Sequence, residues 1–111
     1  MPNLNTTTNQ QFNDKSSFIK QASETVAKAS GKPESYVMIV LNDNADMSFA
    51  GSDAPAAMLD YRALGLPGDR QAFSDTLCTF ISDNLNVDGG RIYISMTDSE
   101  RQNWGWNHST F

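Results

Sequence analysis

A helix, a turn and a strand follow one another twice in this chain, and this internal repeat limits the folds that are open to it. The pattern covers residues 14–41 and returns at residues 69–97, at an offset of roughly 56 residues. With a strand before each helix, each half is a β-α-β unit whose strands run parallel and whose crossover is right-handed. We therefore expect a single α+β domain over residues 1–111, with two β-α-β repeats forming a four-stranded sheet and two helices on one face.

The first helical segment is predicted to begin at Asn13 or Asp14 and to end at Gly31. Apolar residues recur within it at three- and four-residue steps, which predicts one buried face. The residues of that face are Ile19, Ala22, Val26 and Ala29. Pro33 follows two residues after the glycine and cannot continue a helix, so this segment has a physical stop.

The second helical segment follows Pro67-Gly68, with Asp69 placed to cap its first turn. Its apolar residues recur at a strict four-residue spacing, and one further aromatic residue widens the stripe. They are Phe73, Leu77, Ile81 and Leu85, with Phe80 beside them. We expect the stripes of both helices to pack on the sheet as the core. Cys78 lies within this helix and is expected in the core rather than as a reactive thiol.

Four segments are predicted to be strands, namely Asn3–Thr8, Tyr36–Leu41, Ala56–Leu64 and Arg91–Thr97. The last alternates cleanly, because Ile92, Ile94 and Met96 point to one face while Tyr93, Ser95 and Thr97 point to the other. Since both helices cover the same face, the opposite face would lie bare with its tyrosine and other large side chains. A bare face of this kind needs a partner, and the simplest partner is another copy of the chain.

Composition excludes several classes of function. There are 8 Lys+Arg against 13 Asp+Glu, a formal charge of −5 with no basic stripe, so we expect neither a nucleic acid nor an anionic membrane as partner. A single cysteine, Cys78, excludes a disulfide framework, and a single histidine, His108, argues against a Ser/His/Asp triad and a His-rich metal centre. The N-terminal residues do not resemble a secretory signal and no apolar run could span a bilayer, which predicts a cytoplasmic location.

Short motifs along the chain match a known family. They are Met1-Pro2, Gly31-Lys32-Pro33 with Tyr36, Met47-Ser48-Phe49-Ala50-Gly51, Leu64-Gly65, Arg91-Ile92-Tyr93-Ile94 and Gly105-Trp106-Asn107-His108-Ser109-Thr110-Phe111. Each motif is weak alone, but together they occur in order, at near-family spacing and nearly from end to end. By these motifs the chain resembles the macrophage migration inhibitory factor and D-dopachrome tautomerase family, within the tautomerase superfamily. The resemblance implies the same split β-α-β fold, assembled as a homotrimer whose three sheets form a central barrel.

The resemblance also implies an activity, the cofactor-independent keto–enol tautomerisation of α-keto acids such as phenylpyruvate. After removal of Met1, Pro2 would carry a free secondary amine and serve as the general base. Such an amine is a base only while it is unprotonated, and an apolar pocket and a nearby lysine cation both lower its pKa. Lys32 matches the family position that supplies this charge and binds the substrate carboxylate. No metal or organic cofactor is implied.

Further pocket residues are carried over from the family position by position. Leu64 matches a residue whose backbone amide contacts the substrate, and Tyr93 matches a tyrosine that the neighbouring subunit contributes. Ser95 stands where the best-known members have asparagine, and Trp104 replaces a smaller aliphatic residue near the pocket mouth. Asn3, beside the base, stands where the family usually has an apolar residue. The remaining rim positions are Tyr36, Trp106 and Phe111.

Three functions from different classes stay open. A tautomerase is favoured because both the base, Pro2, and the cation that would bind the substrate carboxylate, Lys32, are present. A cytokine-like ligand would use the trimer surface to bind a receptor and would be exported without a signal peptide, and a third type of protein would keep the trimer but lose the activity. Some members carry a Cys-x-x-Cys pair with thiol–disulfide oxidoreductase activity, but the matching positions here are Ala56 and Leu59, so that activity is not expected.

Single positions also have structural interpretations that compete with the functional ones. Lys32 offsets the C-terminal end of the first helix, a role that is compatible with carboxylate binding. Tyr93 and Trp106 would also suit a plain subunit interface, and His108 is expected at the surface or in a cap.

Overall fold

The computed structural model describes all residues from Met1 to Phe111. Its main elements are β1 (Asn3–Thr8), α1 (Lys15–Ser30), β2 (Met38–Asn42), β3 (Ala57–Ala63), α2 (Arg70–Leu85) and β4 (Ile92–Asp98). Short 3-10 turns occupy Glu34–Tyr36, Gly89–Arg91 and Arg101–Asn103, and a small hairpin closes the chain with β5 (Gly105–Trp106) and β6 (Ser109–Thr110). Neither helix has the length and apolar character needed to cross a membrane.

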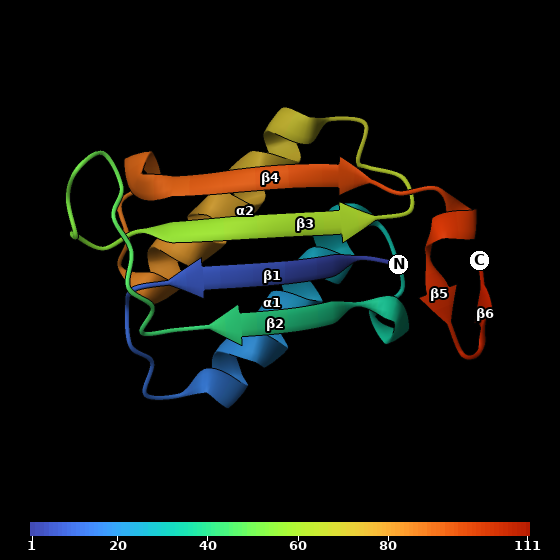
Figure 1. Ribbon diagram of the computed structural model, residues 1–111, viewed down its shortest axis with the longest axis horizontal. Helices are drawn as coiled ribbons and strands as arrows, with labels where there is room; N and C mark the ends of the chain where they lie inside the picture. The colour runs from blue at the N-terminus through green and yellow to red at the C-terminus, as the bar shows by residue number, and fades with distance from the viewer.

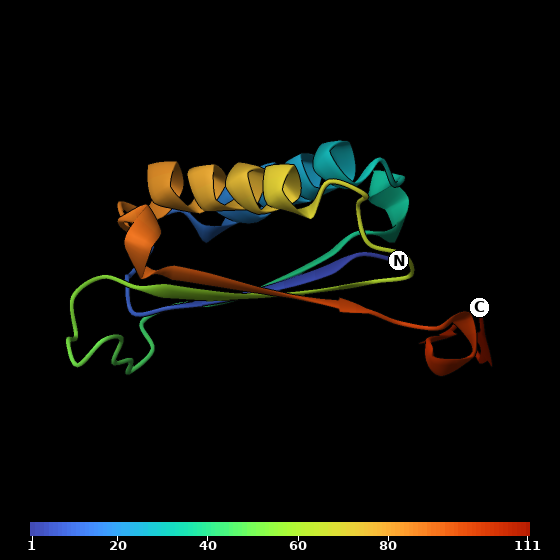
Figure 2. The same ribbon diagram turned by 90° about the horizontal axis from the view of Figure 1, so that it is seen from above.

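The four long strands form one sheet in the order β2-β1-β3-β4 (Figure 1). β1 pairs with β2 in parallel, β3 pairs with β4 in parallel, and the two pairs meet at an antiparallel β1–β3 contact. Both helices lie on one face of the sheet and leave the other face uncovered, as Figure 2 shows. The prediction of two β-α-β repeats with both helices on one face is therefore confirmed.

Both long helices begin and end at the residues that cap them. The side chain of Asp14 accepts a hydrogen bond from the backbone N–H of Ser17 at 3.0 Å, and Asp69 accepts one from Ala72 at 2.9 Å. Because these oxygens satisfy otherwise unpaired N–H groups of the first turn, they fix where each helix starts. α1 ends at Gly31 in the left-handed conformation, with φ of 71°, where a residue without a Cβ is favoured.

The buried face of α1 differs from the predicted one. Phe18, with 4% of its surface exposed, lies in the core with Ala22 and Val26, whereas Ile19 is 38% exposed and its predicted burial is wrong. Phe18 starts a regular four-residue stripe, and its ring packs on Phe12 with centroids 4.7 Å apart. Ile19 lies one position further round the helix and points away from the sheet. The predicted stripe of α2 is confirmed, because all four of its spaced apolar residues are buried.

Three strands start later in the chain than their patterns indicate. β3 begins one residue late, at Ala57, and the other two follow a 3-10 turn. Tyr36 ends a 3-10 turn after Pro33, so β2 begins only at Met38. Arg91 likewise ends a 3-10 turn, and β4 begins at Ile92. In each half the turn reverses the chain between the helix and the second strand, which the alternation of side chains alone does not reveal.

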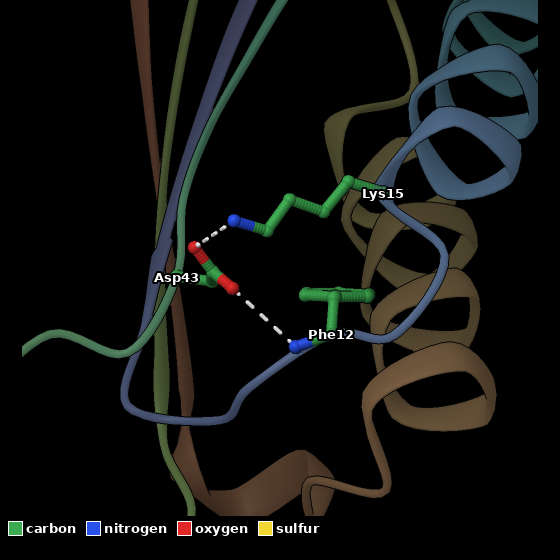
Figure 3. Close-up of polar contacts among 3 residues, drawn as sticks. All are labelled: Phe12, Lys15 and Asp43. Carbon is green, nitrogen blue, oxygen red and sulfur yellow. Dashed lines mark hydrogen bonds and ion pairs between the residues drawn. The ribbon is translucent and has the colours of Figure 1, made fainter.

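Asp43, just after β2, ties the two ends of the first repeat together (Figure 3). Its carboxylate lies 3.1 Å from the Nζ of Lys15 at the start of α1 and accepts a hydrogen bond of 3.3 Å from the backbone N–H of Phe12. The hydrogen bond from Lys15 is the main reason that the pKa of Asp43 is lowered from its ordinary value. The segment before α1 is thereby held against the end of the sheet.

Candidate active site

The start of β1, the turn before β2 and the C-terminal hairpin lie at the same end of the molecule (Figure 1). Residues from all three line a pocket of about 410 Å³. This volume is within the range that small-molecule sites occupy. Most of its lining is apolar, and the lining residues are Met1, Pro2, Asn3, Ser35, Tyr36, Val37, Met38, Trp104, Gly105, Trp106 and Phe111. The pocket thus brings together the predicted base and all four predicted rim residues.

Pro2 is fixed in this pocket by the sheet. Its side chain is less than 2% exposed, and its carbonyl oxygen accepts a hydrogen bond of 2.9 Å from the backbone N–H of Met38. While Met1 is present, the nitrogen of Pro2 belongs to an amide and has no useful basicity. The amine of Met1 has a lowered pKa, first because burial penalises its charge and then because the cations of Lys32 and Arg101 repel it. The environment at this end of β1 therefore favours a neutral amine.

Lys32 lies next to this pocket but does not line it. Its Nζ donates a hydrogen bond of 2.5 Å to the carbonyl oxygen of Leu64, just past the end of β3. Leu64 borders a second, more open and more polar hollow, together with Gly65, Arg101 and Phe111. Phe111 borders both hollows, so they are neighbours. Leu64 lines the second hollow and not the one that contains Pro2, and Lys32 is linked to Leu64 by the hydrogen bond.

Aromatic rings from two parts of the chain form one side of the pocket. Trp106 stacks on Phe111 with centroids 5.5 Å apart and planes at 15°, and Tyr36 meets Trp106 edge-on at 6.4 Å. The hairpin that carries Trp106 turns at Asn107 and His108, which both have positive φ, as a two-residue hairpin turn requires. The hairpin thereby holds two aromatic side chains against the turn before β2.

Tyr93 and Ser95, by contrast, lie outside the pocket of their own chain. Both are exposed on the uncovered face of the sheet, and Tyr93 is 63% exposed. Tyr93 pairs with Met58, which in turn pairs with Thr7, so the tyrosine is five residues along β1 from Pro2. At the usual rise per residue this separates the two by roughly 16 Å.

Four pocket residues had no predicted role in the site, namely Ser35, Val37, Met38 and Gly105. Met38 is the register partner of Asn3 at the β1–β2 contact, so its nearness to Pro2 depends on strand pairing that one sequence does not specify. The Oδ1 atom of Asn3 is buried without a hydrogen-bond partner. An unpaired acceptor therefore lies directly beside Pro2 in an otherwise largely apolar pocket.

Comparisons with known proteins agree with the fold. The family model described as "Macrophage migration inhibitory factor (MIF)" matches residues 1–111. The chain is 39% identical to the macrophage migration inhibitory factor homolog of Brugia malayi, over 86% of this chain and 85% of that protein. It is 33% identical to macrophage migration inhibitory factor of Mus musculus, over 85% and 84%. The crystal structure of the homologue from Prochlorococcus marinus superposes with a TM-score of 0.93 at 35% identity, covering 98% of both chains. The chain belongs to the macrophage migration inhibitory factor family.

Proposed function

We propose that this protein is a cofactor-independent keto–enol tautomerase of α-keto acids such as phenylpyruvate, with Pro2 as the general base once Met1 is removed. The observation that carries the proposal is the place of Pro2, which is buried at the chain's amino end and lines a largely apolar pocket. The amine of Met1, directly before it, has a lowered pKa, and this supports the proposal. A base of this kind must be neutral at working pH in order to accept a proton. Membership of the tautomerase superfamily agrees with this reaction class.

In the proposed reaction the nitrogen of Pro2 removes a proton from the carbon next to the substrate's carbonyl group. The electron pair of the broken C–H bond forms the C=C bond of the enol, and the carbonyl oxygen gains a proton in exchange. The proton that the oxygen gains is the one removed from carbon, which the protonated nitrogen of Pro2 delivers, so the nitrogen ends neutral and no net charge or redox change occurs. Lys32, with an ammonium beside the pocket, would bind the substrate carboxylate and favour the neutral amine.

We further propose that the working site is completed in a homotrimer. Tyr93 and Ser95 lie on the uncovered face of the sheet, and along the strands they are roughly 16 Å and 10 Å from Pro2 of the same chain. Met38 and Tyr93 are large side chains that are 61% and 63% exposed on this face, which favours a covering partner. A second copy would therefore supply its Tyr93 and Ser95 to the pocket of the first.

The lining of the pocket favours a substrate with an aromatic end. Tyr36, Trp104, Trp106 and Phe111 offer ring faces and edges, which suit an aryl group better than a second charged group. Ser95 is short, so we propose that it contacts the distal polar group of a substrate less well than a longer amide would. Substrate choice is therefore the property in which this protein would differ most from its relatives.

Two further parts of the proposal concern other activities. The curated relatives are named as macrophage migration inhibitory factors, which supports a second candidate function as a receptor-binding ligand acting outside the cell after export.

Thiol–disulfide exchange is not proposed, because the single thiol of Cys78 has a pKa raised by burial and by Asp75 and Asp88, which disfavours the reactive thiolate.

The proposal is tested by measuring phenylpyruvate tautomerisation with protein whose loss of Met1 has been confirmed by mass. A matched sample carries one extra residue before Pro2, so that the proline nitrogen stays an amide. We expect turnover only in the sample with the free proline amine. Equal turnover in both samples would place the base elsewhere, and no turnover in a correctly processed trimer would favour the receptor-binding candidate.

A further inference from the structure

The loop of residues 43–56 between β2 and β3 has a fixed shape on the uncovered side of the sheet. It extends beyond the end of the sheet that lies opposite the N-terminus and bends away from the helices (Figures 1 and 2). At its tip Phe49 and Ser52 exchange two backbone hydrogen bonds of 2.9 and 3.0 Å. Ala50 and Gly51 between them both have positive φ, which makes the tip a tight two-residue turn.

Two side chains hold this loop. The amide group of Asn9 makes three hydrogen bonds to backbone atoms of residues 53–56, and Arg91, in the turn before β4, also binds the tip. Its guanidinium donates four hydrogen bonds to carbonyl oxygens of the loop, and the distances are 2.9 Å from Nε to Pro55, 3.1 Å from Nη1 to Phe49, and 3.1 and 3.0 Å from Nη2 to Ser52 and Ala54. It also lies over the ring of Phe49, 5.2 Å from the centroid. No carboxylate pairs with Arg91, so its charge acts on the loop alone.

The same phenylalanine connects Arg91 to the exposed tyrosine of β4. The rings of Phe49 and Tyr93 lie 4.7 Å apart at an angle of 57°. Tyr93 is otherwise 63% exposed on the uncovered sheet, where its χ angles would have little to restrict them. The contact with Phe49 restricts the ring, and Phe49 is itself held through its carbonyl and its ring face by Arg91.

We propose that Arg91 is a positioning residue, which fixes Phe49 and through it the ring of Tyr93 in the orientation that enters the pocket of a second copy. This inference rests on the proposed function, because it assigns Tyr93 to a neighbouring active site. It also gives a role to the contact between Arg91 and Phe49, which are distant in sequence. Arg91 acts through another residue and does not itself touch substrate.

The substitution Arg91→Lys separates the shape of the side chain from its charge. Arginine offers a planar fork of donors that spans four carbonyl oxygens, whereas a lysine ammonium donates from one point and cannot. We expect Arg91→Lys to raise the KM for phenylpyruvate roughly five-fold, the size of effect that one aromatic contact supplies. The kcat, and the KM for an α-keto acid with a short alkyl chain, should stay near the wild-type values. Phe49→Leu should give the same pattern, and Arg70→Lys on the helix side should change neither parameter.

The test is a double-mutant cycle with a second readout that needs no activity. In the cycle, Arg91→Lys should add nothing to the KM effect of Tyr93→Ala. In the Arg91→Lys variant alone, the NMR signals of the Tyr93 ring should lose the shift that the ring of Phe49 causes. Additive KM effects, an unchanged KM in Arg91→Lys, or unchanged ring signals would each overturn the inference. If the wild-type protein has no turnover that depends on Pro2, the proposed function fails instead, and retention of the ring shift in Arg91→Lys would still overturn the positioning role.

Discussion

The Nζ of Lys32 donates a hydrogen bond of 2.5 Å to the carbonyl oxygen of Leu64 and so joins the end of α1 to the end of β3. Both residues lie where their element has just ended, one after Gly31 and the other before Gly65, which both have positive φ. The ammonium is thus held beside the pocket that contains Pro2 rather than extended into solvent. Its charge is close enough to lower the pKa of the chain's amine.

Replacing Lys32 by alanine should weaken the binding of carboxylate substrates. A hydrogen bond to a charged group contributes about 1.5–3 kcal/mol, so we expect the KM for α-keto acids to rise by about ten-fold or more. Esterified substrates should be affected much less, because they lack the charge that Lys32 would bind. Steady-state kinetics on both substrate types test this, with Lys28→Ala in the last turn of α1 as control. An equal rise for acids and esters would contradict a role in gripping the carboxylate.

The uncovered sheet face should be a subunit interface. In sedimentation experiments the wild-type protein should have about three times the 12.2 kDa mass of one chain. Met58→Asp places a charge on this face beside Tyr93 and should give monomers, because a charge buried at an interface without a partner is costly. Ile19→Asp makes the same type of change on the exposed side of α1 and should leave the trimer intact. A wild-type monomer at micromolar concentration would refute the interface.

The contact of Asp43 with Lys15 should make stability depend on pH in acid. The pKa of Asp43 in the folded protein is below its ordinary value of 3.8, so the ionised form is favoured by folding. Its contribution is fully present above that value and is lost as the pH falls toward the folded pKa. Urea unfolding across the acid range should therefore show a smaller loss of stability in Asp43→Asn than in the wild type. Asp83→Asn, on the exposed side of α2, should follow the wild-type curve, and identical curves for all three proteins would contradict the prediction.

The helices and the sheet were predictable because their signals are local. Asp14 and Asp69 start helices by hydrogen bonds within the next turn, and a four-residue stripe specifies which side of α2 is buried. Ile19 was misassigned because Phe18 and Ile19 are adjacent, and only contacts with rings from other segments decide which of them is buried. The β5–β6 hairpin was not predicted, since two-residue strands have no periodicity to detect.

The candidate site was predictable only in part, because some of its residues come together only through strand pairing or through a second copy of the chain. Family motifs indicated Pro2, Tyr36, Trp106 and Phe111, and the structure places all of them around one pocket. Met38 was missed because its place in the pocket depends on the β1–β2 register. For Tyr93, a single chain does not contain the neighbour that its role requires, so only the distance from Pro2 points to a second copy.

The most direct test of the account is phenylpyruvate turnover by Pro2→Gly and Pro2→Ala, compared with the wild-type protein after confirmed loss of Met1. Both variants keep a free amine at the chain start but lose the rigid secondary amine that the pocket holds. We predict a decrease in turnover of about 10²-fold or more, as the loss of a general base causes, with the trimer unchanged. Wild-type rates in either variant would contradict the assignment of Pro2 as the base.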